Sequence, residues 1–205
     1  MKPDSDSGSR SVNVLGVVAG IFMIALPFLG PWWIAVVGTG AIEIALSPFD
    51  MSVSVLGQPI QSELISLFLL AARIAMIIAG VFMIFGSVSP KSWWSKRLVR
   101  FGVMKPFWAV VGIVVFAVAG AFIINNVLPN FLSNMVGGTG ASIQLEVPYL
   151  MGTANSVIQI GSQATVTAPV NVSLATPFWL AVVAAVLGIA ARISHRKYTK
   201  KVESK

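Results

Sequence analysis

Four stretches of this chain are apolar for long enough to cross a lipid bilayer as helices. They cover residues 12–30, 63–87, 106–128 and 176–194. A bilayer core about 30 Å thick requires about 20 helical residues, because a helix rises 1.5 Å per residue. Charged residues make up 10% of the chain, whereas a soluble domain carries about 25%. The sequence therefore predicts a multi-pass membrane protein with four transmembrane helices.

The basic residues are sorted to one side of these four spans. All but one of the 14 Lys and Arg residues fall in three segments: the tail 1–11, the connection 88–105, and the end of the chain from Arg192 onward. The longer connections, 31–62 and 129–175, contain neither Lys nor Arg. Lys and Arg collect on the cytoplasmic side of membrane proteins. We therefore expect a protein of the cell membrane with both termini in the cytoplasm, including the basic tail 195–205, and with the two long connections outside.

Both outer connections show the alternation of apolar and polar residues that is typical of half-buried strands. From Ile158 to Leu174 the even-numbered residues are mostly apolar and the odd-numbered ones mostly polar, with breaks expected near Gly161 and Pro169. Several strands that share an apolar face are stable in water, whereas a single hairpin is marginal. We therefore expect an α+β membrane protein, in which a four-helix bundle carries one extracytoplasmic antiparallel sheet built from both connections.

A short sequence motif occurs once in each half of the chain. "GTGAIEIALSP" begins at Gly38 and "GTGASIQLEVP" begins at Gly138, and the shared block and the proline seven positions after it align without a gap. We therefore expect an internal duplication of a helix–loop–helix unit. The two copies would be related by an axis along the membrane normal.

Four helices that carry an outer sheet resemble, in outline, the claudin-like tetraspan proteins. The tryptophan–cysteine signature of the first claudin loop is absent here, because the chain has no cysteine, and the second connection is the longer one. The resemblance concerns architecture and implies no function.

Arg73 is the one basic residue inside an expected span. It lies near the middle of the second span, within "LFLLAARIAMIIAG". An arginine there costs about 2.5–3.5 kcal/mol, so its side chain should face protein or trapped water. The partners that we expect are the carbonyl of Met23, which Pro27 would release from the first helix, or the carboxylate of Glu43. Three roles are open: a structural arginine that fixes helix register, a binding point for an anion or anionic head group, and a contact with another subunit.

Small residues mark the helix faces that we expect to pack closely. Ala71, Ala75 and Ala79 form a stripe almost opposite Arg73, and Gly80 lies on the Arg73 side of the same helix. Gly16 and Gly20 form a GxxxG pair in the first span. Small residues at such spacing let helices approach each other. We therefore expect these residues to form helix seams.

The connection 88–105 interleaves cations with aromatic rings. The candidates for binding anionic lipid head groups are Lys91, Trp93, Trp94, Lys96, Arg97 and Arg100. This pattern is typical of a short interfacial helix, although ordinary retention of positive charge in the cytoplasm explains the same residues. No stacking platform accompanies them, so nucleic acid is not an expected partner.

Residues that commonly carry chemistry are scarce. The chain has no cysteine and one histidine, His195, so we expect no metal site, no cofactor and no enzymatic activity. The expected function is that of a non-catalytic structural, assembly or accessory subunit. It would use its outer sheet and helix faces to bind other membrane or surface proteins, or copies of itself.

Two alternatives are a small anion channel or transporter with Arg73 lining the path, and an accessory subunit of a membrane redox enzyme complex. The outer connections are rich in Ser, Thr, Asn and Gln and nearly uncharged. A surface that stays soluble without ionised groups suits a very acidic exterior, which suggests an archaeal source.

Overall fold

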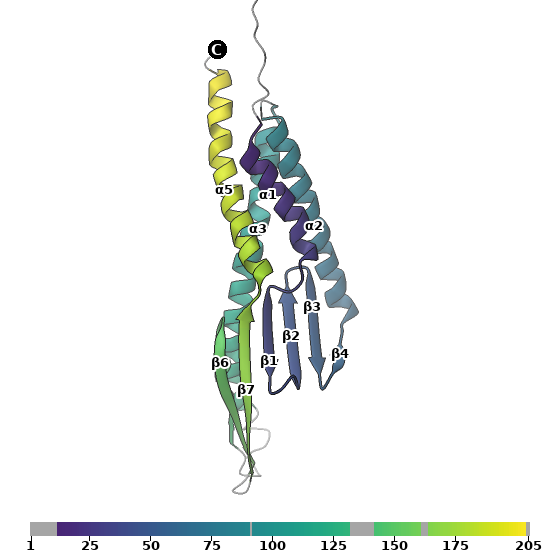
Figure 1. The fold of residues 1–205 in the computed structure, drawn as a ribbon, viewed down its shortest axis with the longest axis vertical. Helices are drawn as coiled ribbons and strands as arrows, with labels where there is room; N and C mark the ends of the chain where they lie inside the picture. Colours follow the sequence, from purple (N-terminus) through teal and green to yellow (C-terminus); the bar gives the residue numbers. More distant parts are fainter. Residues whose placement is uncertain (1–11, 91, 132–141, 161–163, 204–205) are drawn as a thin grey trace, which may run out of the picture. The chain divides into compact units, whose positions relative to one another are not determined.

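The computed structural model describes residues 12–90, 92–131, 142–160 and 164–203. The chain divides into two compact units, each assembled from separate pieces of sequence. The helical unit contains Met1–Ala25, Ala75–Phe107 and Ala181–Lys205, and the sheet unit contains Leu26–Ile74 and Trp108–Leu180. Three long helices contribute residues to both units (Figure 1).

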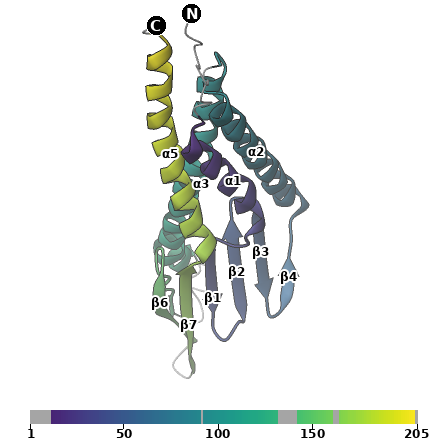
Figure 2. The same cartoon turned by 45° about the horizontal axis from the view of Figure 1, so that its top comes forward.

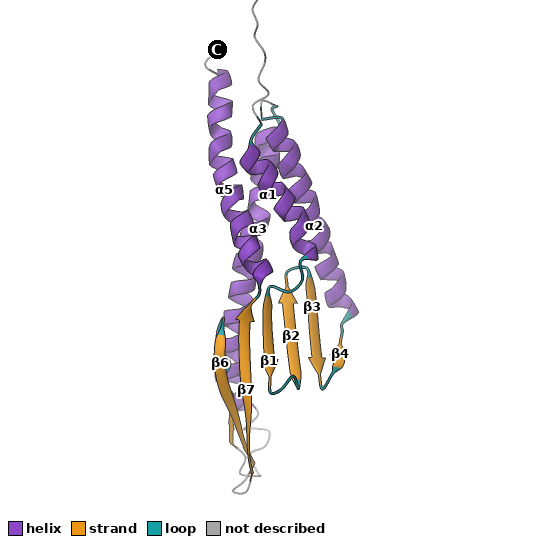
Figure 3. Ribbon diagram, viewed as in Figure 1, coloured by secondary structure: helices purple, strands orange, loops and turns teal. Residues whose placement is uncertain are grey.

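The sheet unit is built on one seven-stranded sheet, drawn in orange in Figure 3. Its strands are β1 (Trp33–Val37), β2 (Ile42–Ser47), β3 (Asp50–Val55), β4 (Gln58–Ile60), β5 (Ser142–Gln144), β6 (Gly152–Ile160) and β7 (Ala164–Leu174). The order is β4-β3-β2-β1-β7-β6-β5, and every neighbouring pair is antiparallel. The two connections meet where β1 pairs with β7. The prediction of a mixed fold with one antiparallel sheet from both connections is confirmed.

Three helices are long and apolar enough to cross a membrane. They are Glu63–Val88, Ser95–Phe131 and Thr176–His195, which belong to α2 (Glu63–Val88), α3 (Ser95–Phe122) with its continuation, and α5 (Thr176–Glu203). The first helix, α1 (Val14–Ala25), has 12 residues and is about 18 Å long. A 3-10 turn, Leu26–Phe28, follows it. The first of the four expected spans therefore stays a prediction.

Two helices extend further than the charge pattern suggested. We expected a separate interfacial helix in 88–105, but α3 begins at Ser95 and continues through Pro106. We expected the fourth helix to end near 194, but α5 continues to Glu203. Lys and Arg are good helix formers. The Lys and Arg residues that flank an apolar run therefore mark the end of an apolar surface and not the end of a helix.

The expected strand break at Pro169 is wrong, because β7 runs through it. Pro169 lies one position beyond the last residue of β7 that pairs with β1, Val170, so its missing N–H interrupts no bond to β1. Its carbonyl accepts a hydrogen bond from Gly38 at 2.7 Å. The other expected break, at Gly161, lies outside the described residues.

The sheet order does not have the two-fold relation expected of a duplicated unit. A two-fold axis along the strands would bring equivalent strands of the two connections together at the centre. Instead β1, the first strand of one connection, pairs with β7, the last strand of the other. The two copies of the motif also precede different strands, because the first leads into the inner strand β2 and the second leads toward the edge strand β5. Gly138 itself lies outside the described residues.

One face of the sheet is apolar and the other polar. On the apolar face, Trp33 pairs with Leu46 on β2, and Val172 pairs with Ala35 on β1; all four residues are buried. The intervening Asn171 and Ser173 are exposed. Residues of α3 line a cavity together with the apolar face, and α3 lies behind β6 and β7 in Figure 1. The part of α3 that belongs to the sheet unit, from Trp108 onward, therefore lies against this face.

The helical unit is packed through glycines. A Cβ on Gly20 of α1 would lie 2.8 Å from the carbonyl oxygen of Gly80 in α2, so the two backbones are in close contact. In the same way, a Cβ on Gly102 of α3 would lie 3.1 Å from the carbonyl oxygen of Ala79. Figure 2 shows α1 between α2 and α5. These contacts allow helix spacings that larger side chains would prevent.

Candidate functional site

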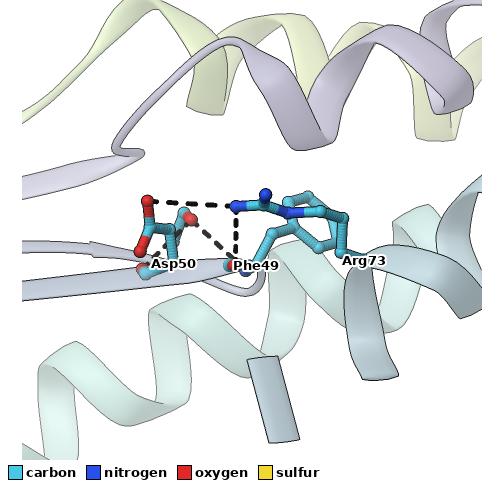
Figure 4. Close-up of polar contacts among 4 residues, drawn as sticks. Phe49, Asp50 and Arg73 are labelled. Carbon is cyan, nitrogen blue, oxygen red and sulfur yellow. Dashed lines mark hydrogen bonds and ion pairs between the residues drawn. The ribbon is translucent and has the colours of Figure 1, made fainter. Parts of the chain in front are cut away.

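Arg73 of α2 contacts the tight turn between β2 and β3. Its Nη2 donates a hydrogen bond to the carbonyl oxygen of Phe49 at 3.3 Å and lies 3.9 Å from Oδ2 of Asp50 (Figure 4). The Arg73 side chain is 33% exposed and the Asp50 side chain 72% exposed. Arg73 therefore fixes the turn to the helix through a charge-assisted bond to the backbone, with a longer ion pair at the surface.

The turn that meets Arg73 is itself held by short contacts. Ser47 Oγ accepts a hydrogen bond from the backbone N–H of Phe49 and donates one to the carbonyl oxygen of Asp50, both at 3.2 Å. The Phe49 ring is buried edge-on against Trp32, with centroids 5.6 Å apart, and Trp32 in turn contacts Phe178. The hydrogen bonds of Ser47 and the ring contact of Phe49 therefore position the carbonyl that Arg73 binds.

The partners expected for Arg73 lie elsewhere among the described residues. Glu43 is exposed in the middle of β2, opposite Ser54 of β3. Met23 is fully buried in the helical unit, where Gly80 packs against its Cβ. The sequence does not predict that this turn contacts the helix, because Phe49 and Arg73 lie 24 residues apart in the chain.

We expect Arg73→Met to destabilise the protein by about 2 kcal/mol, because the Phe49 carbonyl loses a charged donor. Asp50→Asn should cost less than about 1 kcal/mol, because exposed ion pairs contribute little. Both values are measured as free energies of unfolding in mild detergent. An Asp50→Asn cost equal to that of Arg73→Met would show that the ion pair, and not the backbone bond, holds the turn.

The residues expected to form helix seams differ in burial. Ala71 is exposed, Ala75 is half-buried, and Ala79 is buried together with Gly80. Gly16 is also buried, and a Cβ there would collide with Ser87 of α2 and approach Ala191 of α5. The close contacts are therefore made by Gly16, Gly20, Ala79 and Gly80, all in the helical unit.

The basic residues near the start of α3 are exposed. Lys96, Arg97 and Arg100 are exposed, Trp94 is half-buried, and Lys91 lies outside the described residues. The guanidinium of Arg97 lies 5.7 Å from the ring centroid of Trp93. A neighbouring pair, Lys105 and Phe101, is arranged similarly at 5.1 Å. Exposed cations over aromatic rings are compatible with binding at anionic head groups.

A buried polar cluster in the helical unit was missed by sequence reasoning. Asn13, Ser87, Ser95 and His195 are each at most 2% exposed. The Asn13 side chain donates to the carbonyl of Ala191 at 2.8 Å, and Ser95 Oγ lies 3.0 Å from His195 Nε2. His195 follows an apolar span and precedes a basic tail, so the sequence gives no sign that its side chain is buried. The cluster links α5 to the start of α3.

The sheet unit contains an apolar cavity of about 270 Å³ between the sheet and α3. Strand residues such as Ile44 and Met51 form one wall, and Ala117, Gly120 and Ala121 form the other. The one side-chain donor in the lining, Trp33 Nε1, is bound to the Leu150 carbonyl at 3.2 Å. The space is therefore apolar and open in part.

One end of this cavity is fixed by Asn125, which lies in a π-helical turn of the α3 continuation, Ile123–Val127. Its side-chain oxygen accepts from the backbone N–H of Val147 at 2.7 Å, and its nitrogen donates to the Val147 carbonyl at 2.9 Å. Val147 and Ile124 both line the cavity. The amide therefore holds the helix and the segment after β5 at a defined separation.

Exposed apolar residues follow one another along the free edge of the sheet and into α2. They are Leu56, Ile60, Leu64, Leu67 and Phe68, which we call the edge cluster. Leu56 is 78% exposed and has φ of +51° in the turn between β3 and β4. A leucine in this left-handed region costs about 1–2 kcal/mol. The turn thus keeps an exposed leucine where asparagine or glycine would be less strained.

The part of the chain that the structure describes shows no candidate metal centre. Those residues contain no group of three His, Cys, Asp or Glu side chains placed to hold a metal ion. The features that stand out are the Arg73 turn, the apolar cavity and the edge cluster. A comparison with protein-family models and with curated proteins finds no match to this chain.

Proposed function

We propose that this chain is a non-catalytic membrane protein that acts as an assembly or accessory subunit and binds a protein partner through its edge cluster. The observation that carries the proposal is Leu56, an exposed apolar side chain at a strained turn. Strained positions persist where function requires them, and exposed apolar surface favours association.

The proposed arrangement in the membrane follows from charge and length. The three long apolar helices cross the cell membrane, and α1 enters it beside them. The exposed basic residues Lys96, Arg97 and Arg100 lie at the cytoplasmic head groups with both termini. The sheet then lies outside, with its polar face, which includes Glu43, toward solvent or partner.

The contacts of Arg73 favour a fixed structural role over an anion path. An anion that approached its guanidinium would meet the carboxylate of Asp50, 3.9 Å away. Its bond to the Phe49 carbonyl would also have to be given up. We therefore do not propose transport.

The test uses Leu56→Asn, which is expected to have opposite effects on folding and on association. Asparagine suits the left-handed turn position, so the fold should gain about 1 kcal/mol. Loss of the apolar side chain should weaken the complex. The measurements are thermal melting in mild detergent, and native mass spectrometry of the gently solubilised chain with its stoichiometric partner or second copy.

Thr39→Asn is the matched control, because Thr39 is exposed in the neighbouring turn between β1 and β2. It should leave the complex intact. A wild-type chain that runs as a strict monomer with no co-purifying protein would refute the proposal. A complex unchanged by Leu56→Asn would exclude the edge cluster as its contact surface.

A further inference from the structure

We propose that the apolar cavity of the sheet unit binds a hydrocarbon chain of a membrane lipid. The cavity of about 270 Å³ has room for about nine waters at 30 Å³ each. A buried water needs two to four polar partners. The lining residues are apolar or glycine, and the indole N–H of Trp33 is already bound to Leu150. Water is therefore a poor occupant and hydrocarbon a good one.

The sequence keeps the cavity open where a larger side chain could fill it. Ala117, Gly120 and Ala121 lie on the face of α3 toward the sheet, opposite Met51 and other strand residues. A Cβ added to Gly120 would meet no atom within 4 Å. The space therefore exists because small residues occupy this face, and one substitution at Gly120 should close it.

The identity of the occupant follows from the helix that forms one wall. The lining residues of α3 belong to Ser95–Phe131, one of the three segments apolar enough to cross a membrane. Lipid chains are the apolar molecules that such a helix meets throughout the life of the protein. The cavity is also partly open, so a chain can enter it.

The experiment uses the full-length protein in vesicles of phosphatidylcholine that contain a phosphatidylcholine with a diazirine at the end of one acyl chain. After illumination, adducts are mapped by peptide mass spectrometry. We expect adducts on cavity residues of β2 and β3, such as Ile44 and Met51, which lipid outside the protein does not reach. Adducts on exposed α2 residues outside the edge cluster, such as Ile74 and Ile78, report the surrounding lipid and serve as the internal reference.

Gly120→Leu should reduce the strand adducts about tenfold relative to that reference, because the leucine side chain occupies the cavity. Gly112→Leu is the matched control, since a Cβ on Gly112 also meets no atom within 4 Å and Gly112 does not line the cavity. It should keep the strand adducts of the wild type. In delipidated detergent, added phosphatidylcholine should raise the melting temperature of the wild type and of Gly112→Leu, but not of Gly120→Leu.

Three outcomes would overturn the proposal. The first is wild-type labelling confined to the outer surfaces of α2 and α3. The second is an equal loss of strand adducts in Gly120→Leu and Gly112→Leu. The third is a lipid-dependent rise in melting temperature of the same size in all three proteins. The cavity proposal does not depend on the edge cluster, so either can fail alone.

Discussion

Gly20→Leu is expected to destabilise the helical unit by about 3 kcal/mol or more, because the new side chain meets backbone that cannot move aside. A Cβ at this position would lie 2.6 Å from Cγ1 of Ile84 and 2.8 Å from the carbonyl oxygen of Gly80. The flexible Ile84 side chain can rotate, but the carbonyl belongs to α2 itself. The measurement is the free energy of unfolding in mild detergent, followed by circular dichroism.

Gly112→Leu provides the control for the same chemical change in a helix. No atom lies within 4 Å of a Cβ at Gly112, so this variant should gain close to 1 kcal/mol from the better helix propensity of leucine. A lower free energy of unfolding for Gly20→Leu together with a higher one for Gly112→Leu would establish that packing, and not helix propensity, decides the effect at Gly20. A loss at Gly20 below about 1 kcal/mol would mean that α1 shifts away from α2 at little cost.

Asn125→Leu is expected to cost about 3 kcal/mol, because it leaves both the N–H and the carbonyl of Val147 without their present partners. These two groups lie between β5 and β6 and are bound by one amide. The same variant should disturb the cavity, which Val147 and Ile124 help to line. Unfolding free energy and the lipid adducts described above measure the two effects.

The neighbouring Asn126 is the natural comparison. Its side chain is exposed and donates to the carbonyl of Phe122 one turn earlier in the same helix, at 3.0 Å. Asn126→Leu should therefore change stability by less than about 0.5 kcal/mol. Similar costs for the two variants would contradict the idea that Asn125 fixes the helix to the sheet unit.

Much of the fold could be predicted because two periodicities in the sequence have direct physical causes. Long apolar runs predicted helices that start at residues 63 and 176, and α2 and α5 begin at Glu63 and Thr176. Alternation predicted strands in both connections, and buried Val172 between exposed Asn171 and Ser173 follows it. These signals depend on local geometry, so one sequence suffices.

The contacts of the site could not be predicted, because they join segments that are distant in sequence. Arg73 was recognised as a residue that needs a partner, but the Phe49 carbonyl carries no side-chain signature. The burial of His195 depends on α3 beginning at Ser95, and the charge pattern concealed that helix start. The cavity exists because Gly120 has no side chain, and the periodicity of an apolar run does not reveal where a side chain is absent.

The pairing of β1 with β7 has a consequence for the order of events during synthesis. Trp33 pairs with Leu174, about 140 residues later in the chain, and pairings between distant segments form slowly. Until the ribosome has made β7, the central strand β1 is an unpaired edge of the sheet formed by β1 to β4. A chain halted before residue 164 would keep that edge bare, and it should be a target for chaperones or proteases that a completed chain escapes.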